Sequence, residues 1–156
     1  MGVIDGASLI DMGYRLSFER ACAAPAQDVY DLLIDVERWP DWLTAARTTS
    51  WEEPGNPSTR QGAIRQIVVS GLTMREQILV ADRPHHQAYA ILSGIPVTNH
   101  RADVHIHDSA AGSCIVWQAT FEAKVPFTGP LIWLLLRASM PKMVSALAQG
   151  AEQLSG

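Results

Sequence analysis

The sequence predicts an α+β fold in which a curved antiparallel sheet of seven strands wraps around one long C-terminal helix. Three observations support this prediction. Residues 128–154 form the longest helical pattern in the chain, two short helices follow the first strand, and six short β-rich runs with turn signals between them precede the long helix. A sheet that curls around the long helix is the compact way to bury that helix.

The C-terminal helix is more apolar than packing against one sheet requires. Pro130 stands in the first turn, where proline is tolerated. One set of apolar residues recurs at close to the helical period: Ile132, Leu136, Met140, Met143, Leu147 and Leu154. A second set makes the first turns apolar all round: Leu131, Trp133, Leu134 and Leu135. We expect this surplus to form a lid or cavity wall. Arg137 and Pro141 interrupt the run before the roughly 20 apolar residues of a membrane span, so we expect no stable membrane insertion.

Length and composition indicate one domain. We expect a loose leader over residues 1–13 and a single ligand-binding domain over 14–156. The net charge of -4 comes without a basic stripe, so nucleic acid is not an expected partner. Cys22 and Cys114 are too few for a disulfide scaffold, and no signal-peptide pattern begins the chain, so we expect a reducing, cytoplasmic location. The oligomeric state stays open.

The elements follow one another in a simple order. Residues 14–23 alternate apolar and polar side chains, which is typical of a strand with one wet face. Pro25 marks the entrance of a short amphipathic helix. At Trp39-Pro40 the chain should turn before a second short helix, because the residue before a proline disfavours helical geometry. Six strands and the long helix then complete the order of a helix-grip fold.

Four segments carry a resemblance to a known family. They are APAQDVY at 24–30, WPDW at 39–42, GAIR at 62–65 with Arg75-Glu76 and DRP at 82–84, and GIPV at 94–97 with Arg101 and Val116-Trp117. In order and spacing these segments resemble the START-like superfamily, and within it the polyketide cyclase/dehydrase and lipid-transport family, often abbreviated SRPBCC. The resemblance implies a deep hydrophobic cavity between sheet and helix that binds sterols, lipids, quinones or polyketides. In some members the bound chain is cyclised or dehydrated, and the fold alone does not choose among these activities.

Strand parity predicts a group of polar side chains inside this cavity. A tight turn near Gly71 should make Val69 oppose Met74 and Ile67 oppose Glu76. Arg65 is then diagonal to Glu76, within reach of an ion pair. Tyr89 and His100 share the inward parity of their strands, although His100 stands where the resemblance implies an aromatic residue. Glu76 or His100 could then transfer protons while Arg65 or Tyr89 stabilises an enolate oxygen. The alternative is that Arg65 and Glu76 form a buried ion pair that orients the sheet, while Tyr89 and His100 have their hydrogen bonds satisfied at the cavity rim.

Apolar residues from several elements are expected to line the cavity. Large aromatic residues are more often plain core, which is the preferred interpretation of Trp117, whereas Trp133 is a candidate for the lid. The expected lining residues are Trp42, Ile67, Val69, Met74, Ile78, Trp117, Trp133, Leu136 and Met140.

A metal site is not expected. Asp103, His105 and His107 lie on one face of a strand and carry ligand atoms that suit zinc. They point to the opposite face of the strand from the apolar residues between them, so they should face water. The three residues also span about 13 Å along the strand, which is too far to share one ion. His85 and His86 are assigned to a turn. We expect no metal and no other cofactor.

Three functions remain open at this point. The first is binding or transfer of a small hydrophobic molecule such as a lipid, a quinone or a polyketide-like compound, which the surplus apolar surface of the long helix favours. The second is a polyketide cyclase or dehydratase that uses acid/base chemistry in the same cavity. The third is a protein-interaction role, as a toxin or regulator, which a collapsed cavity beside a large exposed apolar patch would favour.

Overall fold

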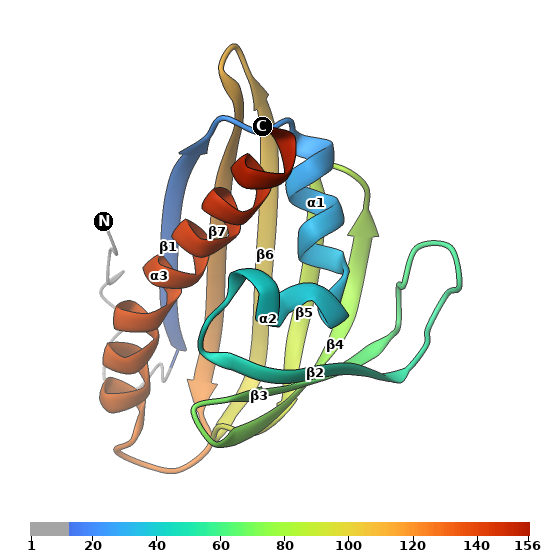
Figure 1. Ribbon diagram of the computed structural model, residues 1–156. Helices are drawn as coiled ribbons and strands as arrows, with labels where there is room; N and C mark the ends of the chain where they lie inside the picture. The colour runs from blue at the N-terminus through green and yellow to red at the C-terminus, as the bar shows by residue number, and fades with distance from the viewer. Residues whose placement is uncertain (1–12) are drawn as a thin grey trace.

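One seven-stranded antiparallel sheet makes up most of the computed structural model, which describes residues 13–156 (Figure 1). The strand order is β1-β7-β6-β5-β4-β3-β2, so β1 pairs with the last strand and the other strands form a meander. The predicted leader over 1–13 lies outside the described residues except for Gly13, the first residue of β1. The elements are β1 (Gly13–Cys22), α1 (Ala26–Ile34), the 3-10 helix η1 (Val36–Arg38), α2 (Trp39–Trp42), β2 (Ala46–Glu53), β3 (Ile64–Val69), β4 (Leu72–Asp82), β5 (His86–Ser93), β6 (Val97–Ser109), β7 (Gly112–Ala123) and α3 (Gly129–Ser155).

The helices cover one face of the curled sheet. Helix α3 packs against β1 and β7, and α1 and α2 pack beside it (Figure 1). The buried core lies between this layer and the sheet and includes Leu16, Ile115, Trp117 and Leu147. The predicted α+β helix-grip fold is therefore confirmed, including the two short helices after the first strand.

The turn between β3 and β4 corrects the predicted strand register. Ser70 and Gly71 both have positive φ, at 51° and 80°, the combination that a two-residue type I′ hairpin requires. Ile67 therefore pairs with Met74, and Arg65 faces Glu76 directly. The predicted diagonal arrangement was wrong because it assumed a loop two residues longer.

The tryptophan corner also differs from the prediction. Trp39 does not precede the second short helix but begins it, with helical φ of -56° and ψ of -39°, and Pro40 occupies the first turn. Burial offsets the unfavourable geometry before proline, because the Trp39 side chain is fully buried and its Nε1 donates a hydrogen bond to the carbonyl of Leu33 at 3.0 Å.

Helix α3 buries part of its predicted apolar face. Ile132, Met140 and Leu147 are buried, whereas Leu154 is 53% exposed because it lies beyond the last buried residue of the helix, Ala151. By length and composition α3 could cross a membrane, since its most apolar window has a mean hydropathy of 1.4. This is weak evidence for a span, because the core helix of a packed domain meets the same criterion and α3 packs against the sheet.

Candidate functional site

An open pocket of about 470 Å³ lies between α3 and the concave side of the sheet. Most of its wall is apolar and comes from both layers. The apolar side chains include Trp39, Leu43, Ile67, Val69, Met74, Ile91, Leu135, Leu136, Met140 and Met143. Among the extra apolar residues of the first α3 turns, Leu135 lines the pocket even though it is 61% exposed. Trp133, also part of that surplus, is instead buried.

The predicted lining residues divide into two groups. Five belong to the pocket wall: Ile67, Val69, Met74, Leu136 and Met140. The other four do not, and each has another contact or place in the core. Trp42 packs against Trp39 with ring centroids 5.4 Å apart, and Ile78 is buried in the core. The indole of Trp117 donates to the hydroxyl of Tyr89 at 3.2 Å, and that of Trp133 donates to the carbonyl of Arg15 at 3.3 Å.

Three of the four predicted polar side chains reach the pocket. Glu76, Tyr89 and His100 belong to its wall, and all three are nearly buried. They come from β4, β5 and β6, which are neighbours in the sheet, so their inward parity brings them together. Arg65 is fully buried behind them and is not part of the wall.

The predicted inward ion pair is present. Nη2 of Arg65 donates to Oε2 of Glu76 at 3.3 Å, with both side chains almost completely buried. The Arg65 guanidinium also lies 4.4 Å from the ring centroid of Trp39 and 4.8 Å from that of Tyr89. Two aromatic faces thus stabilise the cation where water is excluded. Its Nε and Nη1 find no hydrogen-bond partner within residues 13–156.

Burial determines the ionisation of the polar group. It raises the pKa of Glu76, and the opposing effect of the Arg65 charge is smaller. Burial and the Glu76 carboxylate raise the pKa of Tyr89, which therefore keeps its proton. Burial lowers the pKa of His100 to about 4, so its imidazole is neutral at pH 7. Because Nδ1 of His100 accepts the backbone N–H of Ile91 at 3.1 Å, the ring proton resides on Nε2.

The pocket thus presents two neutral donors and one carboxylate at one end of an apolar wall. The donors are the Tyr89 hydroxyl and His100 Nε2–H, and the carboxylate is that of Glu76, whose pKa is raised by burial and which is paired with Arg65. Such a set can bind a carbonyl or hydroxyl oxygen, and it can move a proton to or from a carbon next to a carbonyl.

Sequence reasoning missed several residues of the wall. Ile91 shares the inward parity of Tyr89, two residues before it on β5, so its position could have been predicted. Ser139 and Lys142 lie on either side of Met140 in α3 and also line the pocket, where the helical period gives no signal for a polar side chain. Lys142 is exposed and adds a cation to a mostly apolar lining.

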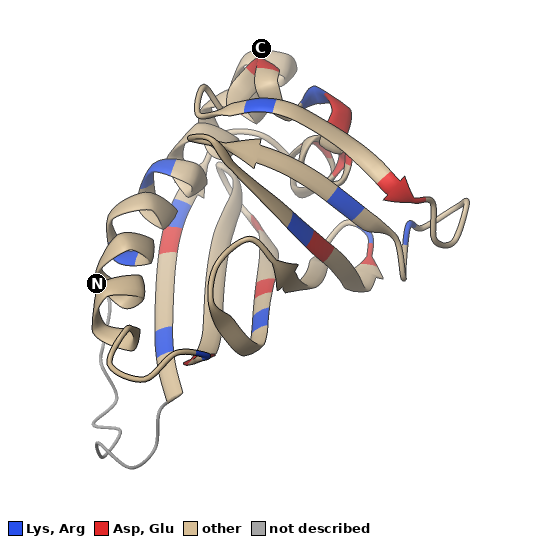
Figure 2. Cartoon of the chain, turned by 90° about the horizontal axis from the view of Figure 1, so that it is seen from below, with Lys and Arg blue, Asp and Glu red and all other residues tan. Residues whose placement is uncertain are grey.

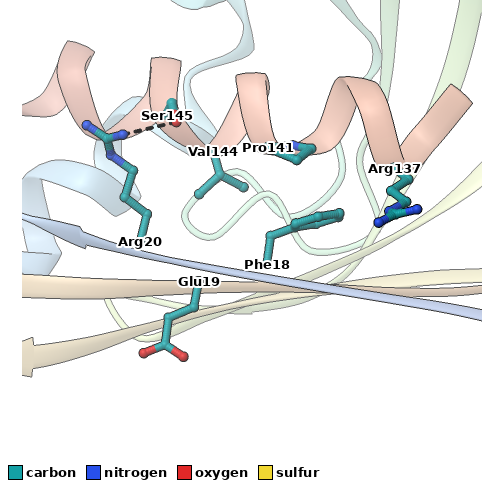
Figure 3. A pocket seen from close by; sticks show the side chains of 7 residues that line it. All are labelled: Phe18, Glu19, Arg20, Arg137, Pro141, Val144 and Ser145. Atoms are coloured by element: carbon teal, nitrogen blue, oxygen red, sulfur yellow. Dashed lines mark hydrogen bonds between the residues drawn. The ribbon is translucent and has the colours of Figure 1, made fainter. Parts of the chain in front are cut away.

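A second pocket, of about 480 Å³, lies between β1 and α3 (Figure 3). Phe18 and Arg20 point toward the helix while Glu19 points away, as strand alternation requires (Figure 3). Arg20 donates to the hydroxyl of Ser145 at 3.1 Å. This groove has no group of buried polar side chains, so the pocket around Glu76 is the stronger candidate.

The charged side chains do not gather on one face. In the view from below, basic and acidic positions are scattered over several strands and helices (Figure 2). Several of them form ion pairs, such as Arg75 with Glu52 and Arg83 with Asp31. This distribution does not resemble the continuous basic surface that follows a phosphate backbone.

Comparisons with known proteins agree with this architecture. The family model described as "Polyketide cyclase / dehydrase and lipid transport" matches residues 15–154. No curated protein matches the chain in sequence.

Three solved structures share the fold at low sequence identity. A norcoclaurine synthase point mutant from Thalictrum flavum has a TM-score of 0.73 and 16% identity, over 92% of this chain and 97% of its own. The di-domain ARO/CYC BexL has a TM-score of 0.73 and 13% identity, over 92% of this chain and 50% of its own. A START superfamily protein from Mycobacterium smegmatis has a TM-score of 0.70 and 17% identity, over 91% and 98%. At these identities the likeness shows a common fold.

Proposed function

The chain belongs to the polyketide cyclase/dehydrase and lipid-transport family, and from that premise we propose that it binds a small, largely apolar molecule in the pocket between α3 and the sheet. The observation that carries the proposal is an apolar wall with three nearly buried polar groups, Glu76, Tyr89 and His100, at one end. The ligand has an apolar body for the wall and an oxygen-bearing end for these groups. A collapsed cavity would favour a protein-interaction role, and the pocket between α3 and the sheet is open instead.

Filling the pocket should abolish this binding. Ile91→Trp adds a large side chain to the wall, so we expect at least a tenfold loss in the affinity for an environment-sensitive apolar dye. Leu92→Trp is the matched control, because Leu92 is the next residue of β5 and is 44% exposed. Its affinity should equal that of the wild type. The absence of saturable dye binding by the wild type, or equal losses in both variants, would contradict the proposal.

Native mass spectrometry of freshly purified protein identifies the natural ligand class. A molecule that co-purifies with the wild type and with Leu92→Trp, and is lost from Ile91→Trp, would belong to this pocket. Solvent extraction and fragmentation of that molecule then distinguish a lipid, a quinone and a polyketide.

A second candidate function is cyclisation or dehydration of a bound polyketide. It is favoured by the raised pKa of Glu76, which is caused by burial and suits a proton-transfer group, next to two neutral donors. Two of the structural relatives have names of enzymes, a synthase and an ARO/CYC. In this mechanism Glu76 removes a proton beside a carbonyl, and Tyr89 and His100 donate hydrogen bonds to the enolate oxygen. Arg65 lies behind the wall and positions Glu76.

The enzyme mechanism predicts a separation of turnover from binding. Tyr89→Phe removes the hydroxyl and keeps the ring, so turnover of a poly-β-keto substrate should fall by about 100-fold while dye affinity stays within a few fold. Thermal unfolding must be measured in parallel, because the indole of Trp117 loses its acceptor. Unchanged turnover in a folded Tyr89→Phe variant would eliminate the proposed role of Tyr89. Absence of turnover by the wild type would eliminate the enzyme mechanism and leave binding as the function.

A further inference from the structure

Two histidines and an aspartate meet on the sheet face that points away from the helices. His86 of β5 pairs directly with His105 of β6, and Asp103 lies two residues before His105. The buried residues between and beside them, Ala102, Val104 and Ile106, face the core, so the three polar side chains face outward. One ligand atom from each of the three lies within 4.8 Å of the others.

We propose that His86, Asp103 and His105 form a binding site for a divalent transition metal, with zinc as the best match. Two imidazole nitrogens and a carboxylate oxygen are ligands that zinc accepts, and three protein ligands leave a fourth position for water. The site is separate from the apolar pocket and does not depend on its function.

The argument against a metal held by Asp103, His105 and His107 still applies to that set. Residues along one strand are too far apart to share an ion. A ligand from the neighbouring strand changes the geometry. His86 of β5 stands directly opposite His105 of β6, whereas Asp103 and His107 are four residues apart on the same strand. His86 was assigned to a turn from the sequence, but it is the first residue of β5.

The arrangement needs only a small adjustment to hold an ion. His86 Nε2 forms a hydrogen bond of 2.8 Å with Oδ1 of Asp103, and a bound metal would replace the proton between these two atoms. The His86 and His105 rings are stacked with centroids 4.2 Å apart and an interplanar angle of 13°. Stacked rings direct their lone pairs in parallel planes, so one imidazole must rotate to bring the ligand atoms to the roughly 3.4 Å separation of a tetrahedral site. Both side chains are only partly buried, so the rotation leaves the core undisturbed.

A neighbouring arginine holds the carboxylate of the site in place. Arg101 donates to both oxygens of Asp103 at 2.9 Å, which orients the carboxylate. A metal on Oδ1 would compete with the hydrogen bond from Arg101 Nη2 and leave Oδ2 paired with Arg101 Nε, the kind of outer contact that metal-binding carboxylates have.

The test is a zinc titration of the full chain without a histidine tag, in competition with a chelating dye. We expect one equivalent to bind and expect His86→Ala and His105→Ala each to weaken binding at least about tenfold. His85→Ala is the control, because His85 is the chain neighbour of His86 but its Nδ1 contacts the carbonyl of Ile106. The absence of a stoichiometric site, or equal losses from His85→Ala and His86→Ala, would overturn the proposal.

A second measurement does not rely on the variants folding. In the proton NMR spectrum of the wild type, zinc should shift or broaden the ring signals of His86 and His105 and leave those of His85 and His100 in place. Cobalt should give the intense visible bands of a four-coordinate ion. Zinc-induced changes confined to other histidines would overturn the assignment even if the protein binds metal.

Discussion

The variant Glu76→Leu is expected to lose about 3–5 kcal/mol of unfolding free energy at pH 7, because it leaves the fully buried Arg65 cation without its carboxylate. Arg65→Met should cost less, since the remaining Glu76 carboxyl can take up a proton. The double variant should be more stable than the sum of the two losses predicts, because an apolar pair of similar volume needs no desolvation of charge. Urea denaturation of all four proteins gives the coupling energy.

The matched control is the ion pair of the adjacent residue. Arg75 donates two hydrogen bonds to Glu52, at 2.8 and 2.6 Å, on the exposed side of the same strand. Arg75→Met and Glu52→Leu should each change stability much less than Glu76→Leu, because water already screens both charges. If the buried and exposed cycles give the same coupling, the Arg65–Glu76 pair does not organise the core.

The unfolding free energy should fall by roughly 3 kcal/mol through His100 alone as the pH drops from 6.5 to 4. The folded protein holds this imidazole with a pKa of about 4, whereas the unfolded chain protonates it near 6.5. Between these values the unfolded state binds more protons, so acid favours unfolding. Below pH 4 both states are protonated and the contribution of His100 no longer changes.

His100→Phe removes this contribution and supplies the aromatic residue that the family resemblance implies. Urea denaturation at pH 7, 5.5 and 4 gives the unfolding free energy of both proteins. Between pH 7 and pH 4 the wild type should lose roughly 3 kcal/mol more than His100→Phe. His85→Ala, a change at an exposed histidine, should give a curve parallel to that of the wild type. Equal acid losses in wild type and His100→Phe would show that burial of His100 does not shift its pKa.

Much of the fold follows from local patterns. The alternation in the strands, Pro130 at the start of α3 and the turn signals between strands predicted the order of the elements, because each depends on residues close in sequence. Strand parity also placed Glu76, Tyr89 and His100 inside, since side chains alternate strictly between the two faces of a sheet. The family resemblance extended these inferences to an apolar cavity.

Tertiary structure decided which residues meet. The sequence by itself determined the element order, the inward faces and the presence of surplus apolar surface on α3. It could not tell that Leu135 reaches the pocket while the Trp133 indole donates to the carbonyl of Arg15. Nor could it tell that Arg65 faces Glu76 directly, or that His86 stands beside His105. Parity tells which way a side chain points, but strand register and the curl of the sheet determine its neighbours, and both depend on the packing of segments far apart in the chain.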